Sequence, residues 1–359
     1  MVAAGYRKGA LKDGEFVFRN VMLKSNAKKV AFTAYAFNSE RIKSATALLD
    51  YEVKTPATAV VKRKAFLLQV GVNHTTAHGC ELKYSVNDAE VMSAALSEKL
   101  RVQGFELVPM KLESVAGETT NTKAGPSATP QDDKFVGSAS KDVIRAELKK
   151  IAAKATPDDV FFMSFSGHGF SAAGGAFYVL PSSLQGNCVH VDDAMLKTAI
   201  SADELAEWLR PIDAGEMTLI LDACYSAESV QAGDFKPGPM GSRGLGQVAY
   251  DKRMHVLAAS QSDAVAHEYD YLHQGLLSYV LVKDGLDKDK ADWKPKDGKI
   301  TVGEWLSYAA AAVPEFKPSA PSGENKGTTV AKTVTGAKAA GQVPALFDFS
   351  REDTLVLAK

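Results

Sequence analysis

The sequence predicts an α/β protein with a central, mostly parallel β-sheet, helices on both faces of that sheet, and a small N-terminal β appendage. Three observations favour this class. Several short segments are continuously apolar, as strands buried on both faces are. They alternate with segments of helical length, as in strand–helix–strand units. Polar, Gly- and Pro-rich stretches of loop character interrupt the alternation, at residues 117–134, 231–253 and about 318–341.

The expected elements follow in chain order. Residues 15–60 hold two segments rich in β-branched and aromatic residues, EFVFRNVML and KKVAFTAYAF, which predict the β appendage of residues 1–60. The remaining residues, 61–359, form the α/β domain. Its expected strands are the apolar runs at 65–73, 105–110, 159–166, 217–223 and 254–260, with an edge strand within 345–359. Its expected helices lie at about 85–100, 140–153, 201–209 and 275–286.

Composition excludes several classes of function. The formal net charge is −1 over 359 residues, whereas a nucleic-acid binder needs a dense basic face. Apolar runs stay well short of the roughly 20 residues that span a bilayer, and the first residues lack the apolar core of a signal peptide. Only three cysteines occur, too few for a disulfide framework. We therefore expect a cytoplasmic protein with free thiols, in which Cys188 has no evident partner and is structural.

Two expected strands end in reactive side chains. The strand FFMSFS leads directly into Gly167, His168 and Gly169, and the strand TLILDA leads directly into Cys224. Ligands meet an open α/β sheet at the carboxyl ends of its strands. If the two strands are neighbours, an imidazole and a thiol therefore emerge at the same edge.

A Cys–His pair at that edge has a specific chemical use. A thiol is mostly protonated near neutral pH, and an imidazole can take its proton and later return it to a leaving amine. The backbone amides of Gly169 and Cys224 are candidates for an oxyanion hole. Taken singly, a strand-end cysteine is more often a small buried hydrophobe and a histidine more often structural. The joint pattern, separated by about 55 residues, is close to the roughly 50 of caspases.

At this point the sequence resembles the caspase-like cysteine peptidases, and among them the metacaspases and bacterial orthocaspases. The matching segments, in the family's order, are AFLLQVGVN, LKYSVNDAE, FFMSFSGHG, LILDACYSA and VLAASQSDAVA. The resemblance implies a caspase-like sheet, catalytic His168 and Cys224, and hydrolysis of peptide bonds. The residues around Cys224 have the D-x-C form of metacaspases rather than the form of animal caspases.

The resemblance also bears on substrate choice. Asp222 lies two residues before Cys224, so alternation along a strand puts the two side chains on one face. Asp88 matches the second acidic pocket residue of metacaspases, and Ser85 and Ser166 match residues that line the pocket. Two carboxylates favour an arginine or lysine side chain. For Asp88, a helix first-turn carboxylate stabilised by the helix dipole is an equally good interpretation.

Metal binding is not expected. Calcium-dependent metacaspases carry an acidic cluster between the histidine and cysteine strands, whereas the segment after His168, FSAAGGAFYVLPSS, has no carboxylate. Asp192 and Asp193 follow later and fit a solvated loop. His74, His78 and Cys80 could suggest zinc, but a fourth ligand at suitable spacing is missing.

In caspase relatives a segment that is often cleaved joins a large and a small part. Here these are about residues 61–230, a linker of 231–253, and 254–359, with Ala259 and Ser260 near the substrate. An enzyme specific for basic residues could cleave itself in the linker, at Lys236, Arg243, Lys252 or Arg253; an uncut solvated linker is the alternative.

The sequence therefore predicts a cysteine endopeptidase that cleaves after Arg or Lys, needs no cofactor, and is a monomer acting on proteins rather than on nucleic acid or membranes. Two alternatives remain. One is a peptidase of the same fold with another specificity. The other is a caspase-like adaptor without activity, although such relatives usually lose one of the two catalytic residues.

Overall fold

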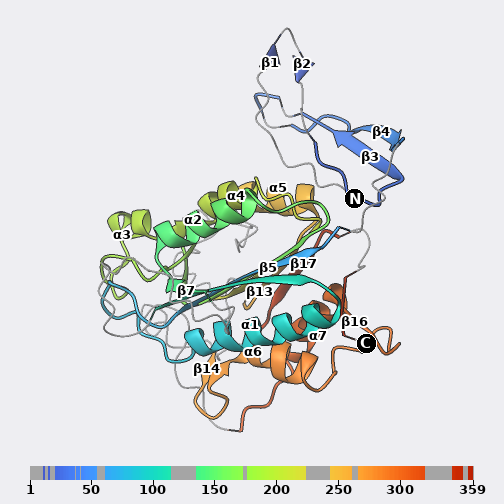
Figure 1. The fold of residues 1–359 in the computed structure, drawn as a ribbon. Helices are drawn as coiled ribbons and strands as arrows, with labels where there is room; N and C mark the ends of the chain where they lie inside the picture. The colour runs from blue at the N-terminus through green and yellow to red at the C-terminus, as the bar shows by residue number, and fades with distance from the viewer. Residues whose placement is uncertain are drawn as a thin grey trace.

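The computed structural model describes most of the chain, namely residues 11–12, 15–16, 21–36, 38–40, 42–54, 61–114, 135–172, 176–223, 243–260, 266–319, 342–350 and 355–358. A seven-stranded sheet forms its centre (Figure 1). In spatial order the strands are β17 (Ala345–Asp348), β13 (His255–Ala258), β12 (Glu216–Asp222), β8 (Val160–Ser166), β5 (Lys64–Val72), β6 (Glu106–Ser114) and β7 (Phe135–Ser138).

All neighbouring strands in this sheet are parallel except β17, which pairs with β13 in the antiparallel direction. The antiparallel edge strand comes from the C-terminal segment in which the sequence predicts one. The predicted α/β class, with its mostly parallel sheet, is confirmed.

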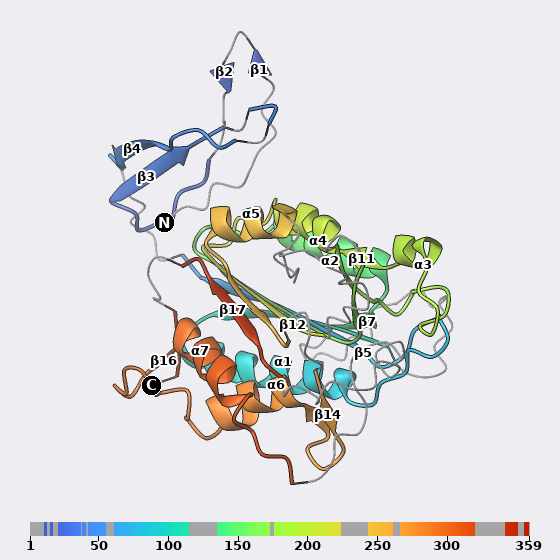
Figure 2. The same ribbon diagram turned by 180° about the vertical axis from the view of Figure 1, so that it is seen from behind.

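Helices cover both faces of the sheet (Figures 1 and 2). One layer consists of α2 (Lys141–Ala152), α4 (Ala202–Leu209) and α5 (Arg243–Lys252). The other consists of α1 (Ser85–Val102), α6 (Leu276–Tyr279), the π-helix η2 (Val280–Leu286) and α7 (Val302–Ala312). Each layer encloses its own hydrophobic core against the sheet.

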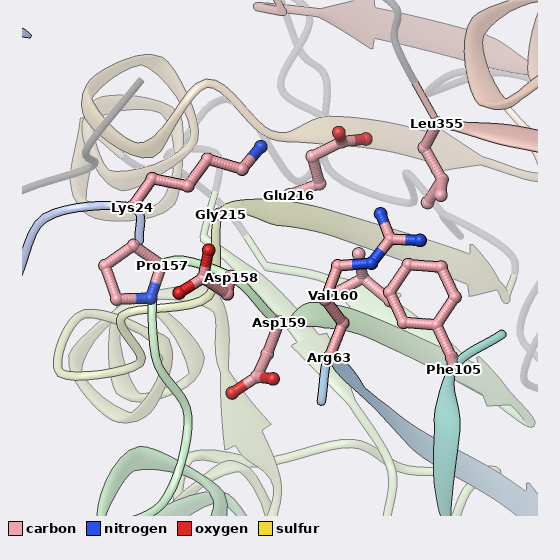
Figure 3. A pocket seen from close by; sticks show the side chains of 10 residues that line it. All are labelled: Lys24, Arg63, Phe105, Pro157, Asp158, Asp159, Val160, Gly215, Glu216 and Leu355. Carbon is pink, nitrogen blue, oxygen red and sulfur yellow. The ribbon is translucent and has the colours of Figure 1, made fainter. Parts of the chain in front are cut away.

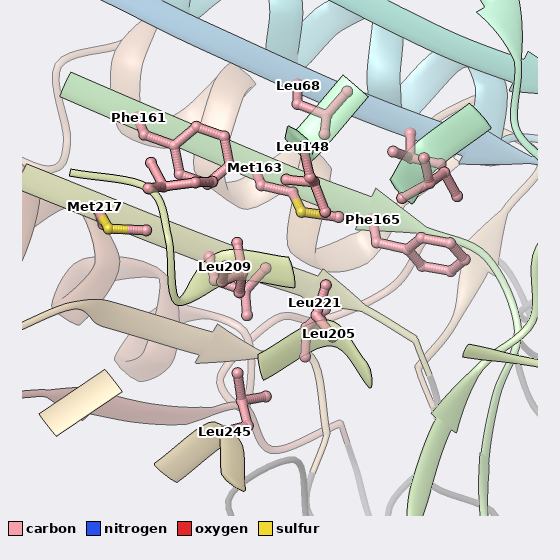
Figure 4. Packing of buried hydrophobic residues seen from close by; sticks show 14 of the residues in the cluster. Leu68, Leu148, Phe161, Met163, Phe165, Leu205, Leu209, Met217, Leu221 and Leu245 are labelled. Carbon is pink, nitrogen blue, oxygen red and sulfur yellow. The ribbon is translucent and has the colours of Figure 1, made fainter. Parts of the chain in front are cut away.

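The continuous apolar runs follow from this two-sided covering. In β8, Phe161, Met163 and Phe165 face the layer of α2, α4 and α5, where Leu148 and Leu205 pack against them (Figure 4). Val160 and Phe162 alternate with them and face the layer of α1. Every residue of β8 is buried, including Ser164 and Ser166, so this strand has no solvent-exposed polar face and its sequence is largely apolar.

Shorter elements surround the sheet. A three-stranded sheet holds β9 (Gly169–Ser171), β10 (Phe177–Val179) and β11 (Ile200–Ser201), and α3 (Asp193–Thr198) lies next to it in the chain. Two further strand pairs are β14 (Glu268–Tyr269) with β15 (Gln274–Gly275), and β16 (Ile300–Thr301) with β18 (Val356–Ala358). In the part of the chain that the structure describes, no helix is long and apolar enough to cross a membrane.

The N-terminal residues form two hairpins outside the main sheet (Figure 1). They are β1 (Leu11–Lys12) with β2 (Glu15–Phe16), and β3 (Lys29–Ala34) with β4 (Ala47–Glu52). Side-chain hydrogen bonds in the described part of the chain tie this appendage to the α/β domain. Ser25 donates its backbone N–H and its hydroxyl to Asp158, and the Tyr35 hydroxyl donates to Asp251 on α5.

One predicted loop is wrong in part. The sequence predicts no regular structure over 231–253, yet α5 occupies Arg243–Lys252. Its two glycines and its polar residues disfavour a helix, but Leu245, Val248 and Ala249 are buried in the core shared with α4. Tertiary packing therefore overrides the local propensity. The rest of that expected linker, 231–242, lies outside the described residues.

Candidate functional site

The strands that precede the two candidate catalytic residues are direct neighbours. β8 and β12 are parallel and in register, so that Ser166 lies opposite Asp222, and Gly71 of β5 lies opposite Ser166 on its other side. His168 follows the end of β8 by two residues, and Cys224 follows the end of β12 by two. Cys224 itself lies outside the described residues. The structure therefore meets the condition on which the sequence argument depends, that the two strands are neighbours.

Backbone hydrogen bonds fix the turn that carries His168. The Gly167 N–H donates to the Asp222 carbonyl at 3.2 Å, which ties this turn to the end of β12. The Leu180 N–H donates to the His168 carbonyl at 3.0 Å, so the facing residues Gly169 and Val179 form a non-hydrogen-bonded pair. In such a pair the amide of Gly169 points away from β10. The His168 side chain is buried.

Two carboxylates lie beside these strand ends. Asp88 and Asp222 are 1% and 2% exposed, so neither is a solvated surface group. The Ser166 hydroxyl donates to Asp88 Oδ2 at 2.7 Å, and the Gly275 N–H donates to Asp88 Oδ1 at 2.9 Å. The Ser278 hydroxyl donates to Asp222 Oδ2 at 2.8 Å. We call Asp88, Ser166 and Asp222 the acidic cluster.

A close approach of α1 to the sheet brings Asp88 to the acidic cluster. Asp88 lies in the first turn of α1, which also fits the helix-dipole interpretation. A Cβ atom on Gly71 would lie 2.5 Å from the Ser85 carbonyl oxygen and 2.6 Å from the Val86 Cα. Only glycine permits this distance between β5 and the start of α1. Asn73 then accepts the Val86 N–H at 3.1 Å and so fixes the helix start.

Sequence reasoning missed several residues around the acidic cluster. Ser85, expected to line a pocket, is buried and donates its hydroxyl to Glu268 Oε1 at 3.4 Å. Glu268, Gly275 and Ser278 were not anticipated, because they join the cluster from more than 50 residues away in the chain. Gly71 was accessible to sequence reasoning, since a glycine within an apolar strand signals a close backbone contact.

The two expected substrate neighbours in the small part follow β13. The Ala259 N–H donates to the Leu221 carbonyl at 2.9 Å, which places Ala259 beside the end of β12. Ala259 and Ser260 are both buried.

Two of the expected self-cleavage residues are not in an open linker. Lys252 ends α5, is buried, and donates to the Ile212 carbonyl at 2.6 Å. Burial lowers the pKa of Lys252 to about 8 against the opposing effect of Asp213. Arg253 follows in a turn with a positive φ of 56°. Lys236 lies outside the described residues, as does the side chain of Arg243, whose backbone begins α5.

Cys188 has a partner, which corrects the expectation from the sequence. It forms a disulfide with Cys80 across 108 residues of chain, with 5.6 Å between the Cα atoms. Cys80 follows β5, and Cys188 lies in the segment between β10 and α3. The backbones of His78 and Cys188 are also hydrogen bonded at 2.9 Å. The inference of a reducing compartment rested on unpaired thiols, and the disulfide removes that premise.

The residues considered for metal binding take other roles or stay apart. Cys80 is in the disulfide, and Asp192 accepts the Met195 N–H at 2.8 Å as the N-cap of α3. Within the described ranges, no group of three His, Cys, Asp or Glu side chains is arranged to hold a metal ion.

A second cluster of charges lies at the opposite end of the sheet. A cavity of about 180 Å³ opens near the amino ends of β5, β8 and β12 (Figure 3). Its lining combines two cations and three carboxylates, Lys24, Arg63, Asp158, Asp159 and Glu216. Asp159 is buried and accepts the N–H groups of Lys64 and Thr156 at 2.7 and 2.9 Å, so it holds a turn in place.

Comparison with known proteins points to one family. The profile described as "Metacaspase, peptidase C14 domain" matches residues 63–232, which include His168 and Cys224. Among solved structures, a protein from Geobacter sulfurreducens is 15% identical, with a TM-score of 0.46, over 82% of this chain and 97% of its own. Caspase-1 from Spodoptera frugiperda is 12% identical, with a TM-score of 0.47, over 83% of this chain and 91% of its own. No curated protein matches this chain.

Proposed function

The chain is a cysteine-type peptidase with a metacaspase-type peptidase C14 domain, and on this premise we propose that it cleaves peptide bonds after Arg or Lys with Cys224 and His168. One observation carries the proposal. β8 and β12 are adjacent and in register, and each is followed two residues later by one of the two reactive side chains. The same edge of the sheet holds the acidic cluster.

In the proposed reaction the Cys224 thiolate attacks the carbonyl carbon of the scissile bond. The oxygen of the tetrahedral intermediate accepts hydrogen bonds from the backbone amides of Gly169 and Cys224. His168 has taken the thiol proton, and it donates this proton to the leaving amine as the C–N bond breaks. A thioester remains. Water attacks it with His168 as the base, the acid product is released, and the Cys224 thiol is restored.

The orientation of Gly169 supports its role in the oxyanion hole. In its non-hydrogen-bonded pair with Val179, the Gly169 amide points away from β10 and is not used in that ladder. His168 lies between this amide and the end of β8 in the chain. The donor and the acid–base group are therefore fixed by one turn.

Asp88 and Asp222 are proposed to bind the basic side chain of the substrate, with Ser85 and Ser166 beside them. A carboxylate has about four acceptor sites, so hydroxyl and amide donors can orient it while a guanidinium binds the same oxygens. Bidentate geometry favours arginine over lysine. Ala259 and Ser260 are proposed to contact the substrate backbone, because β13 is the next strand beyond β12.

Four further properties belong to this proposal. Self-cleavage is proposed at Lys236, Arg243 or Arg253, and Lys252 is left out because it is buried at the end of a helix. Calcium is not required, and equal rates of peptide cleavage with a chelator and with added calcium would support this.

The protein is a monomer, since the edge strand β17 has only four residues and short edge strands pair poorly with a second copy of the sheet. A cytoplasmic location is proposed on the condition that Cys80 and Cys188, which form a disulfide in this structure, are kept reduced in the cell; finding the disulfide in freshly lysed cells would overturn it.

The central experiment is covalent labelling by an arginyl chloromethylketone, followed by intact-mass analysis. The wild type should gain one inhibitor adduct, and Cys224→Ala should gain none. Peptide-library profiling of the wild type should then give Arg or Lys before the cleaved bond. An unlabelled wild type that cleaves no peptide would support an adaptor, whereas cleavage after other residues would support a peptidase of different specificity.

A further inference from the structure

Glu268 is a fully buried carboxylate that contacts the beginning of α1 from a distant part of the chain. Its exposed fraction is 0%. Glu268 Oε2 accepts the Lys83 N–H at 3.1 Å, and Oε1 accepts the Tyr84 N–H at 3.1 Å and the Ser85 hydroxyl at 3.4 Å. Burying a carboxylate is costly unless it is hydrogen bonded. These three hydrogen bonds therefore compensate for the burial of the Glu268 carboxylate.

The contact falls on the turn that precedes Asp88. The N-cap residue Tyr84 makes no side-chain capping bond within α1, and the first N–H groups of a helix need acceptors from elsewhere. Glu268 supplies acceptors just before the helix, and Asn73 supplies one to Val86. A negative charge at this end is also favourable to the helix dipole. Glu268 thus fixes the position from which α1 projects Asp88.

The same region of the small part also orients both carboxylates of the acidic cluster. The hairpin of β14 and β15 donates the Gly275 N–H to Asp88, and the next element, α6, donates the Ser278 hydroxyl to Asp222. β14 lies near the start of α1 in both ribbon views (Figures 1 and 2). The geometry of the cluster therefore depends on this hairpin being docked against α1.

We propose that Glu268 is a positioning residue for recognition of the basic substrate side chain, an inference that rests on the proposed function. It holds the turn of Lys83–Ser85 so that Asp88 and Asp222 act on the same guanidinium or ammonium group, and its own charge adds to the negative potential there. It does not touch the reacting atoms. Its loss should therefore weaken substrate binding more than the chemical steps.

The test is Glu268→Gln, which keeps the shape but removes the charge and sets an amide NH₂ against a backbone N–H. For an arginyl peptide substrate, we expect KM to rise roughly tenfold to a hundredfold, the effect of losing hydrogen bonds to a charged group. We expect kcat to stay within about twofold, as for a loss of uniform binding. Labelling by arginyl chloromethylketone should slow by the same factor as KM rises. Labelling of Cys224 by neutral iodoacetamide should not change.

Asp159 offers a matched control, because it too is a buried carboxylate that accepts two backbone N–H groups and one hydroxyl. Asp159→Asn should lower the melting temperature as Glu268→Gln does and leave KM unchanged. An unchanged KM in Glu268→Gln, or an equal slowing of both labelling reactions, would overturn the proposal. If Glu268→Gln does not fold, Glu268→Asp, which keeps the charge one methylene shorter, decides by the same KM criterion. If arginyl chloromethylketone does not label the wild-type protein, the proposed function is wrong instead.

Discussion

The two ends of the central sheet use buried carboxylates in parallel ways and with different consequences. At the amino end, Asp159 accepts two backbone N–H groups and a threonine hydroxyl beside the cavity of Figure 3. At the carboxyl end, Glu268 accepts two backbone N–H groups and a serine hydroxyl. The contact of Asp159 holds only a turn in place. The contact of Glu268 holds the start of the helix that carries Asp88, whose partner Ser166 lies opposite Asp222.

The difference shows that a buried carboxylate does not by itself mark a functional site. Both contacts satisfy backbone N–H groups that take no part in the sheet ladder, and buried backbone groups need such partners. What distinguishes the carboxyl end is the second set of carboxylates that the contact positions, next to the turn of His168. The amino end should therefore affect stability alone, and the carboxyl end should affect stability and activity together.

The largest expected effect separates the ends by activity. Asp222→Asn should lower kcat/KM for an arginyl substrate roughly a hundredfold or more, because truncating a buried charged partner costs several kcal/mol. Asp158→Asn, at the amino end, should leave kcat/KM within about twofold while it loosens the appendage that Ser25 ties down. Steady-state kinetics on both variants measure this. Equal losses in the two would break the distinction between the ends.

The next effect concerns the disulfide, which links two segments beyond the carboxyl ends of the strands. In a Cys224→Ala background, reduction of Cys80–Cys188 should lower the free energy of unfolding by about 2–4 kcal/mol. Urea unfolding with and without reductant measures the change. The triple variant that also replaces Cys80 and Cys188 by Ala should be insensitive to reductant. A midpoint independent of reductant in the Cys224→Ala protein would mean that these thiols are not paired.

Two glycines permit the third comparison. A Cβ on Gly71 would meet the backbone of Ser85 and Val86, and a Cβ on Gly215 would meet the Pro157 carbonyl. Either alanine substitution should cost about 1–3 kcal/mol of stability through overpacking. Only Gly71→Ala should also raise KM for an arginyl substrate, since it displaces the start of α1. Thermal unfolding and kinetics on the pair test this, and a raised KM in Gly215→Ala would contradict it.

How much of this could be predicted from the sequence depends on the range of the interactions. Most strands of the central sheet were predictable because burial on both faces leaves continuous apolar runs, although β7 was not among the expected strands. That the His168 and Cys224 strands are neighbours was a condition of the sequence argument, and the structure meets it. The helix α5 was not predictable, because Leu245 and Val248 are stabilised by packing against α4 rather than by local propensity. The Cys80–Cys188 pair and the Glu268–Ser85 contact span 108 and 183 residues, and no local pattern encodes such pairings.

The expected effect that should leave activity unchanged is a pH dependence of stability at the amino end. Lys252 lies there with a pKa lowered by burial to about 8, whereas the unfolded chain has the ordinary value near 10.5. Between these values the unfolded state binds more protons than the folded state, so the free energy of unfolding rises with pH through this window, by at most about 1.4 kcal/mol per pH unit. Below pH 8 the penalty for burying the charge is present in full.

Subtracting the free energy of unfolding of Lys252→Met from that of the wild type between pH 7 and 10 isolates this slope from other titrations. The difference should be flat below about pH 8 and then rise, and kcat/KM at pH 7.5 should be the same in both proteins. A flat difference throughout would show that Lys252 keeps an ordinary pKa, and a change in kcat/KM would place the amino end within reach of the site.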